Sequence, residues 1–180
     1  QQVEQWHIFV DREIIYVSAA LGAPGNNGSR SAPFATIEEA LRLLRESERS
    51  TLFLDAGSYT IRGELSFRRP VRIIGGFDGE SWRPGDERTT LRLAAATEGE
   101  SQPGPSFTLA AEGSLTLRRI AVDSVREEPV ARVNEGASLL LEESEVDTLS
   151  ATAVHLLGGD LRLSASRITV PRGGRSILAE

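Results

Sequence analysis

The chain has 180 residues, of which 39% are hydrophobic and 26% charged, and its formal net charge is -6. This is the composition of a soluble globular domain, and an acidic chain offers no basic face for nucleic-acid phosphates. The lack of cysteine excludes disulfides, zinc-thiolate sites and thiol catalysis, and no apolar run is long enough to span a bilayer. We therefore expect a single domain over residues 1–180, with no nucleic-acid partner and no transmembrane segment.

The first fifty residues contain two predicted strands, a loop and one predicted helix. Residues 6–10 and 14–17 are short runs of aromatic and β-branched side chains, which favour strands. Residues 22–33 are rich in glycine, asparagine, serine and proline and therefore predict a loop. Thr36 and Glu39 fit a capping box, which predicts a helix that begins after Thr36 and runs to about residue 48.

The rest of the chain carries a repeated pattern of short alternating runs. Residues 115–122, 139–146 and 161–168 match position for position, and less regular copies occur between residues 52 and 93. A period of roughly 20 to 25 residues, with no helix between the strands, is typical of a β-solenoid. The alternative is an antiparallel β-sandwich, which also has short strands at regular spacing but does not predict the match in register.

The phase of the repeat predicts which side chains enter the core, because alternate residues of a strand point to opposite faces. Ser144 and Ser166 are expected to point inward and to find hydrogen bonds there, with each other or with the backbone at the bend. The apolar residues predicted to share the core are Leu115, Leu117, Ile120, Val122, Leu139, Leu141, Val146, Leu161, Leu163 and Ile168.

The same alignment predicts corners and cross-strand neighbours. A two-residue break in each segment places residues 118–119, 142–143 and 164–165 at stacked corners. Glu145 should lie next to Arg167, and Arg118 next to Glu142, so that outward side chains form ion pairs between successive strands. The alternative role for the corner arginines is to bind an anion or a sugar acid.

Five short segments, residues 16–18, 25–28, 32–41, 55–59 and 73–79, together resemble the N-terminal part of right-handed parallel β-helix proteins of the pectin-lyase-like superfamily. The resemblance implies an all-β fold, a right-handed parallel β-helix with one N-terminal capping α-helix. It is silent on activity, because the superfamily contains lyases, glycoside hydrolases, adhesins and surface proteins.

The resemblance also implies how the single domain is organised and where it works. Residues 1–50 would supply strands, loop and capping helix, and residues 51–180 would supply the coils, with the series cut short at its C-terminus as one interpretation. An extracytoplasmic location is expected: secreted, periplasmic or at the cell surface. A chain that starts at Gln1 without methionine fits a mature protein after signal cleavage or a segment of a longer protein.

The residues give no complete catalytic site. Polygalacturonase-like members use clustered aspartates and a histidine motif, whereas this chain has only His7 and His155, and we interpret His155 as a packed or surface residue. Pectate-lyase-like members use calcium with a lysine or arginine base, and lysine is absent. Asp123 and Asp147 hold equivalent positions on neighbouring strands and are weak candidates for calcium, but with Thr169 they supply too few oxygens. We expect no catalytic residue, no cofactor and no metal.

A ligand site is expected on the loops, since loops on a rigid scaffold carry much of protein function. The two excursions from the repeat are residues 78–89 and 94–106. Aromatic rings near the first excursion, together with Trp6 and Tyr16, can stack on sugars, or they can pack beneath the loop. The candidate ligand-binding residues are Phe77, Asp78, Trp82 and Arg83.

The last residues, 175–180, begin another alternating run and predict an open strand edge. Such an edge favours further coils, self-association or a protein partner, and a polysaccharide is a further candidate ligand. The leading interpretation is a non-catalytic binding or structural module that acts in adhesion, envelope architecture or assembly. The alternative is the N-terminal fragment of a polysaccharide lyase or glycoside hydrolase whose catalytic coils follow Glu180.

Overall fold

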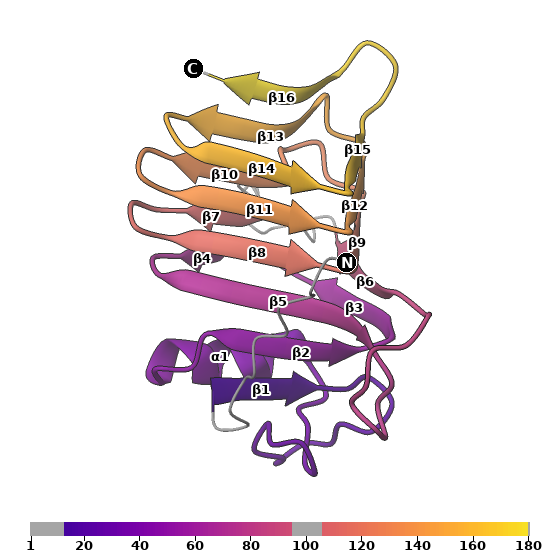
Figure 1. Cartoon of the computed structure of the whole chain (residues 1–180). Coiled ribbons are helices and arrows are strands. Elements are labelled where there is room, and N and C mark those ends of the chain that lie inside the picture. Colours follow the sequence, from indigo (N-terminus) through magenta and orange to yellow (C-terminus); the bar gives the residue numbers. More distant parts are fainter. Residues whose placement is uncertain (1–12, 95–105, 180) are drawn as a thin grey trace, which may run out of the picture.

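The computed structural model describes residues 13–94 and 106–179, which form three parallel β-sheets and one helix (Figure 1). Sheet A contains β1 (Ile14–Val17), β2 (Thr51–Asp55), β5 (Pro70–Phe77), β8 (Ser114–Arg118), β11 (Ser138–Glu142) and β14 (Asp160–Ser164). Sheet B contains β3 (Gly57–Ile61), β6 (Thr89–Leu93), β9 (Ile120–Ser124), β12 (Glu145–Thr148) and β15 (Arg167–Thr169). Sheet C contains β4 (Leu65–Phe67), β7 (Phe107–Leu109), β10 (Ala131–Asn134), β13 (Thr152–Leu157) and β16 (Arg175–Ala179). The predicted strand at residues 6–10 lies outside the described residues.

The chain visits the sheets in the same order, A then B then C, from β2 to β16. We call each set of three consecutive strands a layer, so that the first layer is β2–β4 and the fifth is β14–β16. Each layer lies on the one before it, and all the paired strands are parallel (Figure 1). This arrangement is compatible with a β-helix and rules out the antiparallel sandwich.

The strand register confirms the alignment made from the repeat. Leu139 lies opposite Leu115 on one side and Leu161 on the other. Val146 lies in the same way between Val122 and Ile168. Because the side-chain period of a strand is two, a slip of one residue would have turned the apolar set outward.

The predicted corners between sheets A and B are left-handed turns. Arg119, Glu143 and Ala165 occupy the corner in successive layers, with φ of 57°, 50° and 49°. A residue in this conformation bends the chain sharply within a single position, which accounts for the short break in each repeat. Non-glycine residues adopt it at a cost of roughly 1–2 kcal/mol.

Seven of the ten predicted core residues are buried, and the three in the fifth layer are less so. Leu161 and Ile168 are half-buried, and the prediction was wrong for Leu163, which is 45% exposed. The reason is physical: a side chain in a stacked layer is covered from both sides, and no described residue lies beyond β14 in sheet A. Leu141, at the equivalent position in the fourth layer, is only 1% exposed.

The hydroxyls of the two inward serines form hydrogen bonds with backbone groups rather than with each other. The Ser144 hydroxyl lies 2.8 Å from the Glu142 carbonyl oxygen and accepts the amide hydrogen of Ile120. The Ser166 hydroxyl donates to the Ser164 carbonyl and accepts the amide hydrogen of Ser144. The serines therefore stabilise the corners across successive layers.

The opposite end of the stack is covered by helix α1 (Ile37–Glu46) and a loop (Figure 1). Thr36 and Glu39 form the predicted capping box, and the helix ends at Glu46, two residues earlier than expected. Arg69 donates to the carbonyls of Leu44 and Ser47, which takes up the carbonyl groups left free where the helix ends. Within the described residues, no helix has the length and apolarity needed to cross a membrane.

Candidate functional site

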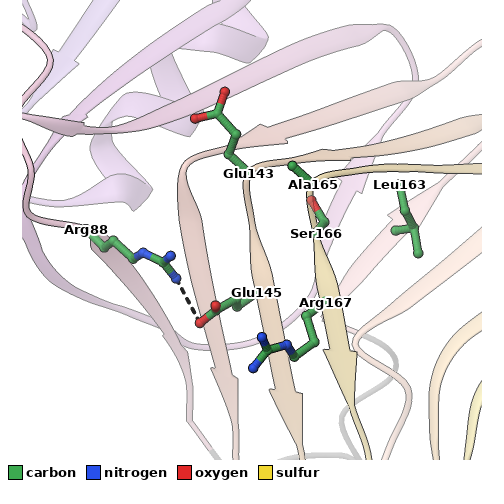
Figure 2. Close-up of a pocket in the computed structure, with 7 residues that line it drawn as sticks. All are labelled: Arg88, Glu143, Glu145, Leu163, Ala165, Ser166 and Arg167. Carbon is green, nitrogen blue, oxygen red and sulfur yellow. Dashed lines mark ion pairs between the residues drawn. The ribbon is translucent and has the colours of Figure 1, made fainter.

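The fifth layer forms one wall of a charged pocket at the corner between sheets A and B (Figure 2). The pocket has a volume of about 310 Å³ and is open to solvent. Its floor and walls come from the fourth and fifth layers, with one arginine reaching in from the segment before β6. The lining residues are Arg88, Glu143, Glu145, Leu163, Ala165, Ser166 and Arg167.

Arg88 and Glu145 are joined by an ion pair across the pocket. Arg88 Nη1 lies 2.8 Å from Glu145 Oε2, and the two side chains meet at β9, the strand between them (Figure 2). The β9 residue opposite Glu145 is Ala121, whose small side chain leaves the path open. Hydrogen bonding to Arg88, helped by the charges of Arg88 and Arg167, holds the pKa of Glu145 below its ordinary value.

The other acid of the pocket is paired with a residue outside it. Glu143 Oε1 lies 3.2 Å from Arg118 Nη2, whereas the sequence predicted Arg118 beside Glu142. The strand register does place Arg118 opposite Glu142, but the ion pair forms with the next residue, which stands at the left-handed corner. Arg119 donates to the Gly85 carbonyl and so holds the loop before β6.

Arg167 lies opposite Glu145, as predicted, and is exposed. Its guanidinium extends over the neighbouring strand into the pocket (Figure 2). The pocket thus combines two acids and two arginines, with each acid held by an arginine. Such a site offers charge-assisted hydrogen bonds but no unpaired carboxylate that resembles a catalytic base.

The pocket adjoins an exposed strand edge. Among residues 13–94 and 106–179, no strand pairs with the outer sides of β14, β15 and β16. Leu163 is 45% and Ile177 is 41% exposed, although both hold positions that are buried in the preceding layer. We call the outer sides of these three strands, with Leu163 and Ile177, the C-terminal edge.

The predicted ligand residues on the loop after β5 split into a buried pair and an exposed pair. Phe77 stacks on Phe53 with ring centroids 4.3 Å apart, and Trp82 meets Tyr16 edge to face at 4.7 Å. Trp82 has φ of 53° and donates from Nε1 to the Arg30 carbonyl. Both rings are buried on the outer face of sheet A, where they pack beneath the loop.

Asp78 and Arg83 are exposed and shape the same loop. Asp78 Oδ1 accepts hydrogen bonds from the Ser81 hydroxyl and amide, each at 2.7 Å. These bonds to Ser81 lower the pKa of Asp78. Asp78 also donates its amide hydrogen to the Arg83 carbonyl. The four residues therefore lie together, but only Asp78 and Arg83 are accessible to a ligand, and their binding role stays a prediction.

The weak calcium candidates lie opposite one another as predicted. Asp123 on β9 faces Asp147 on β12, and both are exposed. Arg92 precedes them in the column and Thr169 follows them. Across the described part of the chain, no group of three or more histidine, cysteine or acidic residues is placed to hold a metal ion. His7 and Trp6 lie outside the described residues.

His155 belongs to a polar column on the outer face of sheet C. It lies opposite Arg132 on β10, which lies opposite Thr108 on β7. Arg132 Nε and Thr108 Oγ1 are shielded from solvent and make no hydrogen bond within the described residues. The repeat placed these residues on adjacent strands, but spacing does not reveal that their polar atoms are covered.

Sequence reasoning missed a buried carboxylate at the end of β2. Asp55 accepts hydrogen bonds from the hydroxyls of Ser18, at 2.5 Å, and Tyr59, and from the Ala19 amide. Burial is the main cause of the raised pKa of Tyr59. The hydrogen bond to Asp55 and its charge raise this pKa further, so the phenol keeps its proton. A Cβ at Gly79 would lie only 2.9 Å from Asp55 Oδ2, so the loop after β5 closes the site. The network is enclosed, and its hydrogen bonds hold the N-terminal loop against the first layer.

Arg126, in the segment after β9, is a second residue that the repeat did not reveal. It is 3% exposed, and its guanidinium donates to the carbonyls of Ala94, at 2.6 Å, and Gly63, at 3.1 Å. These carbonyls belong to the two preceding layers. Arg126 therefore ties three layers together where the chain leaves sheet B.

The chain matches no family model, no curated protein and no solved structure. The three stacked parallel sheets are compatible with a β-helix, and the resemblance to the pectin-lyase-like superfamily rests on the sequence motifs alone.

Proposed function

We propose that this chain is a non-catalytic right-handed parallel β-helix of the pectin-lyase-like type, which serves as a structural module of a secreted, periplasmic or cell-surface protein. Its role is to offer the C-terminal edge to the β-strands of a partner, in adhesion, envelope architecture or assembly. Support for the fold comes from the repeated order of sheets A, B and C and from parallel pairing throughout.

The observation that carries this proposal is the difference between the two ends of the stack. At the first end, β1 hydrogen-bonds to the loop through Gly28 and Phe34, and α1 packs against β1 and β3. At the other end Leu163 and Ile177 are exposed next to strands with no outer partner among the described residues. Open edges with apolar side chains favour pairing with another strand.

The roles of the polar groups support a structural function. The acids of the pocket are bound by arginines, the buried Asp55 accepts three hydrogen bonds, and Arg126 holds backbone carbonyls. In each case the charged group holds layers or loops together. A catalytic base needs a free lone pair within reach of a substrate.

Hydrogen exchange followed by mass spectrometry tests the proposal, with light scattering to measure the mass over a wide concentration range. Amides of β14–β16 should exchange much faster than those of β11–β13, because their outer groups face water. A partner strand bound at this edge should slow that exchange. A strict monomer in which the fifth layer is as protected as the fourth would overturn the proposal.

One observation favours the second candidate, a fragment of a polysaccharide lyase or glycoside hydrolase. Thr108 Oγ1 and Arg132 Nε are shielded polar atoms in one column, and His155 continues it. Arg132 and His155 are half-buried, so a sugar acid can reach the parts of these side chains that face solvent. Titration with oligogalacturonate separates the candidates: binding that is lost in Arg132→Met and kept in Arg92→Met would support the lyase or hydrolase fragment, and absence of binding would refute it.

A further inference from the structure

The fourth and fifth layers carry opposite charges. Residues 136–157 contain four acids, Glu142, Glu143, Glu145 and Asp147, and no arginine. Residues 158–179 contain four arginines against one aspartate, a formal charge of +3. These arginines are Arg162, Arg167, Arg172 and Arg175, and all four are exposed.

Both ion pairs between layers in the described residues join an arginine to an acid, although Asp123 and Asp147 of neighbouring layers also lie opposite one another. Arg118 of the third layer pairs with Glu143 at the start of the fourth, and Arg88 of the second pairs with Glu145. Arg167 of the fifth layer lies opposite Glu145 and helps to lower its pKa. The basic fifth layer thus lies on an acidic layer, and its four exposed arginines favour acids on its other side as well.

A second copy of this chain does not place acids against these arginines. Two C-terminal edges placed end to end would bring four arginines against four arginines, and like charges on directly opposed strands destabilise the pairing. The other end of the molecule is closed by α1 and the loop that covers β1, so it presents no strand edge in sheet A. Charge therefore selects against pairing of two C-terminal edges, and the covered first end selects against head-to-tail stacking of identical copies.

We infer that the C-terminal edge binds an acidic β-strand segment of a partner polypeptide. The inference rests on the proposed function and names the chemistry of the partner. The added strands would pair with β14 and β15, their apolar residues would cover Leu163, and their carboxylates would face Arg162 and Arg167. Arg162 and Arg167 stand on the outer faces of sheets A and B, in the columns that follow Leu140 and Glu145.

The chain itself supplies a probe with the right geometry. A synthetic peptide of residues 136–149 reproduces β11 and β12, which pair with the inner sides of β14 and β15. A matched neutral peptide carries E142Q, E143Q, E145Q and D147N and keeps every apolar residue. Each labelled peptide is titrated with the 180-residue chain, and fluorescence anisotropy reports binding at low and at high salt.

The acidic peptide should bind about tenfold more tightly than the neutral one, and salt should remove most of the difference. Arg167→Glu and Arg162→Glu should each weaken the acidic peptide by roughly two- to fivefold or more and leave the neutral peptide unchanged. Arg92→Glu is the matched control, because Arg92 is an exposed arginine of sheet B that lies three strands from the edge.

Equal binding of the two peptides would overturn the acidic partner and leave the strand-docking function standing. If neither peptide binds, the inference fails, and hydrogen exchange at β14–β16 decides separately whether the edge is open. If an edge variant is misfolded by circular dichroism, the comparison of the two peptides on the unaltered chain still decides the outcome.

Discussion

Arg88, directly before β6, and Glu145, on β12, form an ion pair although β9 lies between these two strands. Arg88 Nη1 and Glu145 Oε2 lie 2.8 Å apart, and the β9 residue opposite Glu145 is Ala121. The contact links the loop before β6 to the fourth layer, so it spans the same distance along the stack as the buried Arg126. The charged surface of this protein is thus organised along the stacking direction.

Removal of Arg88 should raise the pKa of Glu145. Arg88→Met takes away the hydrogen bond and the charge that lower this pKa, and it leaves only Arg167 nearby. A carboxyl with a depressed folded-state pKa stabilises the fold above its unfolded pKa, and this contribution is lost as the pH falls through the folded value. NMR titration of the Glu145 side chain should show the rise, with Arg62→Met as control, because Arg62 is an exposed arginine directly after β3 that does not line the pocket. An unchanged pKa would mean that the pair does not persist in solution.

Leu141→Ala and Leu163→Ala should differ sharply in cost. The two leucines face each other in sheet A, but Leu141 is 1% and Leu163 is 45% exposed. Loss of the buried side chain should lower the free energy of unfolding by about 2–5 kcal/mol, and loss of the exposed one by less than about 1 kcal/mol. Urea unfolding measures both. Similar costs would show that the fifth layer is covered in solution.

The register, the corners and most of the core could be predicted from the sequence because the repeat imposes them. When Leu115, Leu139 and Leu161 share one phase, parallel stacking places them in one column without any knowledge of the loops. The same reasoning failed for Leu163, since a repeat specifies the inward direction but not whether another layer covers it.

Residues outside the repeat could not be placed in this way. Asp55 meets Ser18 only because a loop folds back over the first layer, and Arg126 reaches carbonyls more than thirty positions away in the chain. The sequence left open whether Trp82 stacks on a sugar or packs beneath the loop, and the structure shows its ring packed against Tyr16 from a left-handed backbone. Such contacts depend on loop conformation, which no periodic signal encodes.

Arg126→Met should destabilise the protein by about 2–4 kcal/mol, because it removes the donors of buried carbonyls at Ala94 and Gly63. The stability of Arg126→Lys should lie between that of the unaltered protein and that of Arg126→Met. A lysine ammonium keeps the charge but cannot reach both carbonyls as the planar guanidinium does. Arg92→Met, at an exposed position, is the control for loss of an arginine. Urea midpoints that do not differ between the Arg126 and Arg92 variants would contradict the bridging role.

Tyr59 should make the protein sensitive to alkali. Its folded-state pKa is raised above the ordinary value of 10.0 by burial and by Asp55. A raised folded pKa gives stability that is complete below the unfolded pKa and lost as the pH rises above it. The urea midpoint should therefore fall above about pH 10. In Tyr59→Phe this fall should be smaller, while stability at neutral pH drops by about 1–3 kcal/mol because Asp55 loses a donor. A parallel decline in both proteins would exclude Tyr59 as its source.

Glycine should have opposite effects at a corner and in a strand. Ala165 adopts φ of 49° at the corner before β15, where a Cβ costs roughly 1–2 kcal/mol that glycine avoids. Glycine also makes the unfolded chain more flexible, at a cost of about 0.5–1 kcal/mol, so Ala165→Gly should stabilise the fifth layer by about 0.5 kcal/mol. Ala121 lies in the extended strand β9, where glycine brings only the entropic cost and should destabilise. Hydrogen exchange at β14 and β15 reports the first effect, because the fifth layer can open locally, and urea unfolding reports the second. Faster exchange in Ala165→Gly would mean that the corner is not left-handed in solution, and the stacking of Arg119, Glu143 and Ala165 at one corner would have to be abandoned.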